Sequence, residues 1–138
     1  SIENKKVHLA LIEALYLVEK GKIEVKKKIA EQIARKGTKK QKNFMTRYYV
    51  YKDMRDRGYT IKTALKFGAD FRVYDKGVKP GEDHAKWVMY PVRESEGLTW
   101  QDFSAKNRVA HSTRKRLLIG VVDDENCVTY YEIKWTRP

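Results

Sequence analysis

The amino-acid sequence predicts a mixed α/β protein, with a small α+β module over residues 1–43 and a mixed-sheet domain over residues 44–138. Three observations lead to this prediction. Helical periodicity dominates residues 3–20, residues 36–42 are polar, basic and poor in apolar side chains, and helical and β-prone runs alternate from residue 44 onward. With 138 residues, 41% of them apolar, the chain can bury the core of one ordinary domain or of two small ones.

The N-terminal module begins with a predicted helix over residues 3–20, because apolar residues recur on one helical face. The residues of that face are Val7, Leu11, Ala14, Leu15 and Val18. Gly21 is placed to end the helix. A short alternating segment over residues 22–25 predicts a strand, and residues 26–35 return to a helical pattern.

The larger domain opens with a predicted helix over residues 44–57, which Gly58 closes. Its aromatic and apolar residues have helical spacing, namely Phe44, Tyr48, Tyr51 and Met54. Three strand-like runs follow, over residues 59–67, 69–75 and 85–92. Gly68 separates the first two runs, and a Gly/Pro-rich turn precedes the third.

A second helix and two further strands complete the domain. The helix is predicted to start at Thr99, whose hydroxyl can cap the amide of Asp102. Strongly β-prone runs over residues 116–122 and 128–135 predict the last two strands, which an acidic turn over residues 123–126 joins. Helix, three strands, helix and two strands make a mixed α/β domain.

The chain carries a net charge of +12, which indicates an anionic partner. Residues 1–44 are the most basic part, with 12 Lys and Arg against 5 Asp and Glu. A Lys- and Glu-rich thermophile surface is the alternative explanation, and charge alone does not distinguish RNA from DNA or a membrane. The sequence contains no run of 18 apolar residues and no signal-peptide pattern, so we expect a soluble, cytoplasmic protein. Cys127 is the only cysteine, which excludes a disulfide framework within one chain.

Two stretches, Ala69–Trp87 and Arg108–Asp123, hold three residues suited to metal-free RNA cleavage. Tyr74 ends an alternating apolar run, His84 follows the Gly/Pro-rich turn, and Lys115 precedes a strand within a basic stretch. Taken singly, each has an ordinary interpretation: a packed tyrosine, a histidine in a polar turn and a solvated lysine. The sequence around the three residues decides between these ordinary interpretations and a catalytic one.

Both stretches closely resemble the catalytic half of the archaeal tRNA-splicing endonuclease. The resemblance begins at Tyr48–Tyr59 (YYVYKDMRDRGY), continues through Lys66–Tyr74 (KFGADFRVY) and Arg108–Lys115 (RVAHSTRK), and reaches Tyr130–Trp135 (YYEIKW). It covers residues 44–138 and implies a restriction-endonuclease-like catalytic domain. The N-terminal third matches mainly at residues 13–21 and is shorter than the usual N-terminal domain of the family.

The resemblance implies a division of labour that the chemistry also supports. Metal-free cleavage requires deprotonating the 2′-hydroxyl, protonating the 5′-oxygen and neutralising the phosphorane. His84 is implied as the general acid, since histidine has an ordinary pKa of about 6.5, and Lys115 as the cation on the phosphorane. Tyr74 is implied as the general base. Because free tyrosine has a pKa of about 10, either a neighbouring cation lowers it or Tyr74 only orients the 2′-hydroxyl.

The implied substrate is precursor tRNA with a bulge-helix-bulge, and the implied products end in a 2′,3′-cyclic phosphate and a 5′-hydroxyl. No cofactor and no metal are implied. In this family a cation and a flat side chain clasp a bulged base, a role that falls here on Arg108 and Trp135. Stacking of this kind is worth about 1–3 kcal/mol per base. The alternative for Trp135 is simple packing at the chain end.

The acidic turn is also assigned a role by the resemblance. In the family, a loop at this place inserts into a basic pocket of a neighbouring subunit, which assigns Asp123, Asp124 and Glu125 to a subunit interface. The alternative is a solvated hairpin turn. The last strand, Val128–Trp135, is expected to pair with its counterpart across a dimer axis. The compact N-terminal module favours a heterotetramer in which a second, non-catalytic subunit supplies the missing surface.

Two other functions compete with this prediction. A metal-dependent nuclease of the restriction-endonuclease type would need carboxylates and a lysine converging on a divalent ion. The available carboxylates are Asp70, Asp75, Glu82 and Asp83, and Glu132-Ile-Lys134 offers one suitably spaced lysine. A non-catalytic RNA-binding subunit is the other alternative, but it would be expected to lack part of the Tyr74, His84 and Lys115 set.

Overall fold

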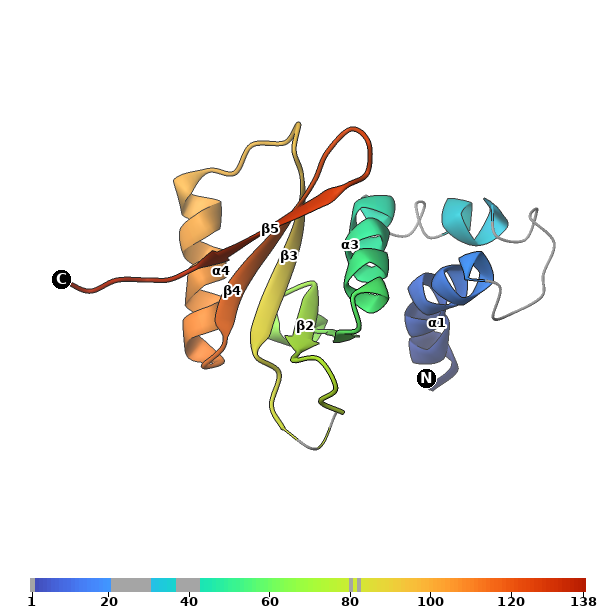
Figure 1. Cartoon of the computed structure of the whole chain (residues 1–138), viewed down its shortest axis with the longest axis horizontal. Helices are drawn as coiled ribbons and strands as arrows, with labels where there is room; N and C mark the ends of the chain where they lie inside the picture. Colours follow the sequence, from blue (N-terminus) through green and yellow to red (C-terminus); the bar gives the residue numbers. More distant parts are fainter. Residues whose placement is uncertain (1, 21–30, 37–42, 80, 82) are drawn as a thin grey trace.

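The computed structural model describes residues 2–20, 31–36, 43–79, 81 and 83–138 (Figure 1). Its elements are α1 (Ile2–Glu19), α3 (Phe44–Asp56), β1 (Thr60–Thr63), the 3₁₀ helix η1 (Leu65–Phe67), β2 (Phe71–Tyr74), β3 (Trp87–Arg93), α4 (Trp100–Ser112), β4 (Arg116–Val122) and β5 (Val128–Ile133). Residues 31–36 are also helical. The predicted mixed α/β class is therefore confirmed. The expected strand over residues 22–25 and the polar stretch at residues 37–42 lie outside the described residues.

The described strands form one five-stranded sheet in the order β1-β2-β3-β4-β5. All neighbours are antiparallel except β3 and β4, which run parallel with Trp87 opposite Arg116. A parallel pair requires a long crossover, because the chain must return to the same end of the sheet. Helix α4 provides this crossover. It begins at Thr99, whose side chain accepts from the Asp102 amide while the Asp102 carboxylate accepts from the Thr99 amide, so the predicted cap is confirmed.

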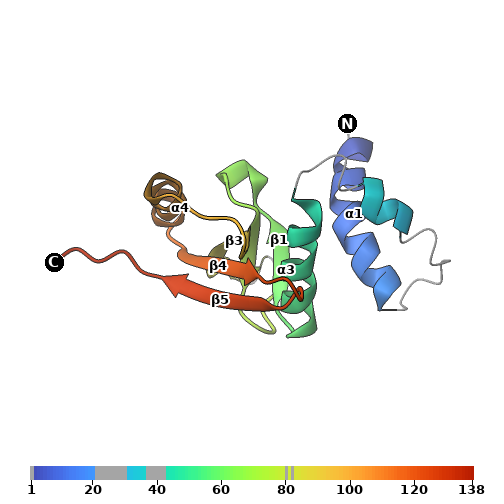
Figure 2. The same cartoon turned by 90° about the horizontal axis from the view of Figure 1, so that it is seen from above.

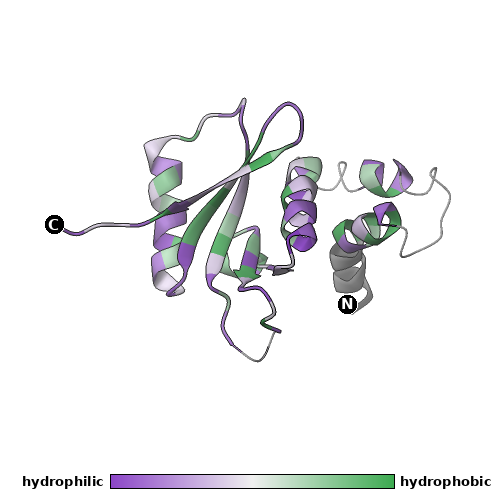
Figure 3. Ribbon diagram, in the orientation of Figure 1, coloured by the Kyte–Doolittle hydropathy of each residue, from purple (hydrophilic) through white to green (hydrophobic). Residues whose placement is uncertain are grey.

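Helices α3 and α4 cover opposite faces of the sheet (Figure 2). On the α3 face, alternate strand residues pack with α3 into one core cluster, including Ile61, Phe71, Val73, Met89 and Val122. On the α4 face, the other alternate residues pack with Ala110 of α4, including Val88, Tyr90, Leu117 and Ile119. The apolar middle of β4 is visible in Figure 3. Gly120 allows α3 to approach closely, because a Cβ there would lie 3.2 Å from both methyl groups of Val50.

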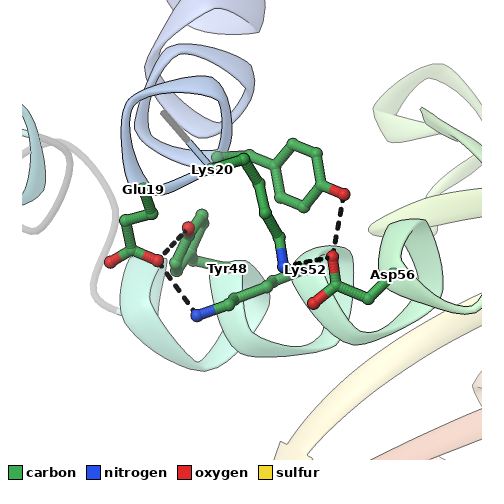
Figure 4. Close-up of polar contacts among 6 residues, drawn as sticks. Glu19, Lys20, Tyr48, Lys52 and Asp56 are labelled. Carbon is green, nitrogen blue, oxygen red and sulfur yellow. Dashed lines mark hydrogen bonds and ion pairs between the residues drawn. The ribbon is translucent and has the colours of Figure 1, made fainter. Parts of the chain in front are cut away.

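Helix α1 packs on α3 through buried Ile12, Leu15 and Tyr16, and polar contacts flank this packing (Figure 4). The buried Tyr48 donates to Glu19 at 2.6 Å, and Lys52 reaches the same carboxylate oxygen at 3.1 Å. Tyr16 donates to Asp56 at 2.8 Å, and Lys20 lies 2.9 Å from the same oxygen. The described part of the N-terminal region thus shares a core with the sheet domain.

Replacing Tyr48 by phenylalanine removes the hydrogen bond that joins α3 to Glu19. We expect Tyr48→Phe to lower the free energy of unfolding by about 1–2 kcal/mol near pH 7. Tyr49→Phe, for which the described residues provide no hydroxyl partner, serves as the matched control and should change little. Urea unfolding of both variants checks this; equal losses would contradict it.

The same contact has a pH signature. Burial and the hydrogen bond to Glu19 raise the pKa of Tyr48, so folding favours its neutral form. A raised folded pKa contributes stability that is present below the unfolded pKa of about 10 and is lost as pH rises beyond it. The stability difference between the wild type and Tyr48→Phe should therefore shrink above pH 10.

The predicted strand over residues 59–67 is wrong in its second half. The strand ends at Thr63, and Leu65–Phe67 form the 3₁₀ helix η1, which Gly68 ends with a left-handed φ of 82°. β1 and β2 are antiparallel neighbours, so the chain must reverse between them. The apolar residues Leu65 and Phe67 lie in that reversal, and their side chains are exposed. The predicted last strand also ends early, at Ile133, so Trp135 lies beyond it. No described helix is long and apolar enough to cross a membrane.

Candidate active site

Tyr74 is the last residue of β2 and lies opposite Thr60 of β1. Its neighbour Val73 packs on the α3 face, and side chains alternate along a strand. Tyr74 therefore belongs to the opposite face, the one that α4 covers further along the sheet. The side chain is buried, with 6% of its surface exposed.

His84 lies in the connection between β2 and β3. This connection turns at Gly77 and Gly81, whose φ values of 78° and 96° favour glycine. The backbone amide of His84 donates to the carboxylate of Asp83 at 2.7 Å. The His84 side chain is exposed.

Lys115 lies between α4 and β4. The helix ends at Ser112 with Thr113 as its C-cap, and Arg114 takes a left-handed φ of 56° that redirects the chain. The amide of Lys115 then donates to Ala110 at 2.9 Å. Its side chain is half-buried, and Nζ donates to the carbonyl of Ala85 at 3.3 Å.

The backbone brings these three residues to one end of the sheet. The amide of Lys86 donates to Val73, the residue before Tyr74, at 2.9 Å, and the carbonyl of Lys86 accepts from Arg116 at 2.9 Å. The end of β2 and the starts of β3 and β4 are thus adjacent. Ala85, which accepts from Lys115, directly follows His84. We call this set of three, Tyr74, His84 and Lys115, the strand-end cluster.

Several other charged groups at the strand ends are already paired. Lys86 lies 3.6 Å from Asp75 and also contacts the Trp87 ring at 4.6 Å. Arg116 pairs with Glu132 at 3.2 Å. In contrast, within the described part of the chain the Lys115 ammonium contacts a neutral carbonyl and no carboxylate, so its charge is available to an anion.

Two carboxylates of the metal-dependent alternative, Asp70 and Asp75, lie at opposite ends of β2. Asp70 precedes β2 and pairs with Arg47 at 3.0 Å, whereas Asp75 follows β2 at its other end. Burial raises the pKa of Asp70, and burial lowers the pKa of Arg47, because their side chains leave water together. Among the described residues, no three His, Cys, Asp or Glu side chains gather as a metal site. Glu82 lies outside those residues.

Arg108 and Trp135 are both exposed, and Trp135 has 57% of its surface accessible. The cation stacked on the Trp135 ring is Arg137, at 5.4 Å, and the ring of His111 stands edge-on at 5.5 Å. The stacking depends on how the chain continues after β5, which no local pattern shows.

The acidic turn is a tight hairpin connection. The carboxylate of Asp123 accepts from the amides of Glu125 and Cys127, both at 2.9 Å, and Asn126 takes a left-handed φ of 63°. Arg93 donates to the Asp123 carbonyl at 3.0 Å. Asp123 therefore builds the turn, while the side chains of Asp124 and Glu125 are exposed.

A basic protein with a histidine, a lysine and a tyrosine at one end of a mixed sheet has the features of a nucleic-acid-processing enzyme. Comparison with known proteins defines the family. The family model of the tRNA intron endonuclease catalytic C-terminal domain matches residues 44–130, and that of its N-terminal domain matches residues 2–34. The chain therefore belongs to the tRNA intron endonuclease family, and the predicted enzyme class, a tRNA-intron lyase, is confirmed.

Archaeal relatives support this over nearly the whole chain. A tRNA-splicing endonuclease of Nanoarchaeum equitans is 49% identical over 94% of this chain and 90% of its own length. Similar enzymes of Thermococcus kodakarensis and Pyrococcus abyssi are 46% and 44% identical, over 96% and 99% of this chain and 79% and 80% of their own lengths. The resemblance thus extends into the N-terminal region.

Proposed function

We propose that this chain cleaves precursor tRNA at bulge-helix-bulge sites by metal-independent transesterification at the strand-end cluster. The observation that carries the proposal is the convergence of Tyr74, His84 and Lys115 on adjacent strand ends, with Lys115 bonded to the carbonyl next to His84. The end of β2, the connection that follows it and the start of β4 meet there, and each brings a residue type that one step of the reaction needs.

The reaction balances without a metal or a water molecule. Tyr74, ionised to the tyrosinate, accepts the proton of the 2′-hydroxyl and becomes the neutral phenol, and the 2′-oxygen forms a bond to phosphorus. The bond between phosphorus and the 5′-oxygen breaks, and His84 donates a proton to that oxygen. The ammonium of Lys115 stabilises the extra negative charge on the non-bridging oxygens. The products are a 2′,3′-cyclic phosphate and a 5′-hydroxyl.

The separation of Asp70 from Asp75 supports this mechanism over the metal-dependent alternative. The two mechanisms differ in their products as well as in their ions. Hydrolysis by a metal-activated water would leave a linear terminal phosphate and would form no 2′,3′-cyclic phosphate. Product ends are therefore as informative as the rate.

Cleavage of a bulge-helix-bulge RNA in excess EDTA tests the proposal directly. We expect full activity with cyclic-phosphate ends, either from this chain alone or after addition of a non-catalytic partner subunit. Mass spectrometry identifies the ends, and titration with Mg²⁺ measures any ion requirement. Cleavage that appears only with Mg²⁺, or that leaves linear phosphate ends from the start, would refute the mechanism.

We also propose that Trp135 stacks on a bulged base, together with Arg108 of α4. The exposure of both side chains and the cation already stacked on the Trp135 ring support this role. Loss of the stack in Trp135→Ala should weaken RNA binding about 5- to 100-fold. Unchanged affinity for the bulged RNA would contradict it.

The proposed assembly is a heterotetramer with a second, non-catalytic subunit. Exposed Asp124 and Glu125 are available to a basic pocket, and β5 is the edge strand of the sheet, with Tyr131 55% exposed. Sedimentation of the chain with and without a candidate partner tests this. A monomer under both conditions would refute the assembly and leave the chemistry untouched.

A further inference from the structure

An unusual pair of cations lies beside the strand-end cluster. Lys62 of β1 and Arg72 of β2 are directly opposite each other in the register. Like charges in this position repel and destabilise a strand pair. Among the residues that the structure describes, neither side chain has a carboxylate at ion-pair distance: Asp70 is held by Arg47 at 3.0 Å, and Asp75 pairs with Lys86 at 3.6 Å.

Arg72 by itself also lowers the stability of the folded protein. It is half-buried, and its Nε is enclosed without a hydrogen-bond partner in the described part of the protein. A buried, unpaired guanidinium nitrogen loses its hydration with no compensating bond. The terminal nitrogens of Arg72 make no hydrogen bond or ion pair with the described residues. An arginine with free terminal nitrogens is suited to bidentate binding of a phosphate.

The pair lies on the same face of the sheet as Tyr74. Ile61 and Val73 pack on the α3 face, so Lys62, Arg72 and Tyr74 project to the other side. Arg72 and Tyr74 are two residues apart on one strand, which separates their Cα atoms by about 6.6 Å. That step is comparable with the step between neighbouring phosphates of an extended RNA strand. Helix α4 packs chiefly on β3 and β4, and Figure 2 shows it on this face of the sheet.

We propose that Lys62 and Arg72 form a binding site for the RNA phosphate next to the scissile one. The inference rests on the proposed function, because Tyr74 defines where the scissile nucleotide lies. A bound phosphate would hold the two like charges together and accept hydrogen bonds from the terminal nitrogens of Arg72. The site would position the RNA strand for Tyr74 without taking part in proton transfer.

Salt-dependent binding of an uncleavable RNA tests the site. The probe is a bulge-helix-bulge RNA with a 2′-deoxy nucleotide at the cleavage position, and the full chain is used with any partner that activity requires. For each phosphate contact, the slope of log K against log salt concentration changes by about 0.7 for single-stranded nucleic acid. We expect Arg72→Gln and Lys62→Gln each to flatten the slope by up to this amount.

Lys66→Gln provides the matched control. Lys66 is an exposed lysine of η1, at the other end of the β1–β2 pair from Tyr74, so its loss changes the net charge equally. It should leave the slope near the wild-type value. Replacing the flanking phosphate by a neutral methylphosphonate should flatten the wild-type slope, and should flatten it less in Arg72→Gln, where only the Lys62 contact is left to lose.

Stability provides a second readout. Because the two cations repel, Lys62→Gln should raise Tm by about 1–4 °C while it weakens RNA binding. A residue that served the fold alone would lower Tm and leave the slope unchanged. Lys62 is exposed, so this variant should fold even if Arg72→Gln does not.

The outcomes separate this inference from the proposed function. If the wild type cleaves the matching 2′-hydroxyl RNA but both variants keep the wild-type slope, the phosphate site is refuted and the enzyme stands. If the wild type, with its partner present, neither binds the 2′-deoxy probe nor cleaves the matching 2′-hydroxyl RNA, both proposals fail. Flatter slopes in both variants, with the wild-type slope in Lys66→Gln, would establish the site.

Discussion

His84→Ala is expected to slow cleavage in EDTA by about 10²–10⁴-fold at saturating RNA, because the 5′-oxygen would leave without a proton. The His84 side chain is exposed in the connection between β2 and β3, so its loss should hardly affect the fold. Single-turnover rates measure the chemical step separately from binding. Circular dichroism should show an unchanged structure.

A modified substrate makes this prediction specific to the general acid. When sulfur replaces the 5′-bridging oxygen, the leaving group departs as a thiolate and needs no proton. His84→Ala should then cleave nearly as fast as the wild type. His111→Ala is the matched control, since His111 is also exposed and its ring stands against Trp135. An equal loss on the oxygen and sulfur substrates would rule out His84 as the acid.

Lys115→Ala is expected to slow cleavage by about 10²–10³-fold, with little change in RNA affinity. A positioned donor at a developing oxyanion contributes mainly to the transition state, so its removal lowers the rate more than the binding. The side chain is half-buried and bonded to Ala85 beside His84, which fixes the position of its charge. The ratio of single-turnover rate to Kd separates the two effects.

Arg114→Ala is the control for Lys115, because it removes an exposed neighbouring cation of the same basic stretch. We expect that variant to weaken binding slightly and to keep the wild-type rate. Lys115→Arg should retain part of the activity, since it keeps the charge but not its compact shape. A loss confined to Kd in Lys115→Ala would show that Lys115 only attracts RNA.

Local signals predicted the elements whose formation depends on local physics. The run Arg116–Val122 predicts β4 at its observed bounds, and Thr99 with Asp102 predicts the start of α4, because β propensity and helix capping act over a few residues. The strand predicted through residue 67 was wrong because strand propensity does not show that β2 returns beside β1. Because the chain reverses between β1 and β2, Leu65–Phe67 form the 3₁₀ helix η1 instead of continuing the strand.

The site divides in the same way. The sequence context of Tyr74, His84 and Lys115 points to them before any coordinates, but their proximity arises from backbone pairing across three strand ends. Arg72 carries no signal of its own in the sequence. A charged residue in an alternating strand is ordinarily solvated, and only the register reveals that it faces Lys62.

The sequence by itself determined the mixed α/β class, the basic charge and the family, because composition, periodicity and motif spacing are properties of the chain alone. The tertiary structure decided which charges are paired and which remain available. Asp70, Asp75 and Glu132 are matched by Arg47, Lys86 and Arg116 respectively. The physical reason is that ion pairing depends on distances between segments far apart in the sequence, which pairing of the strands sets.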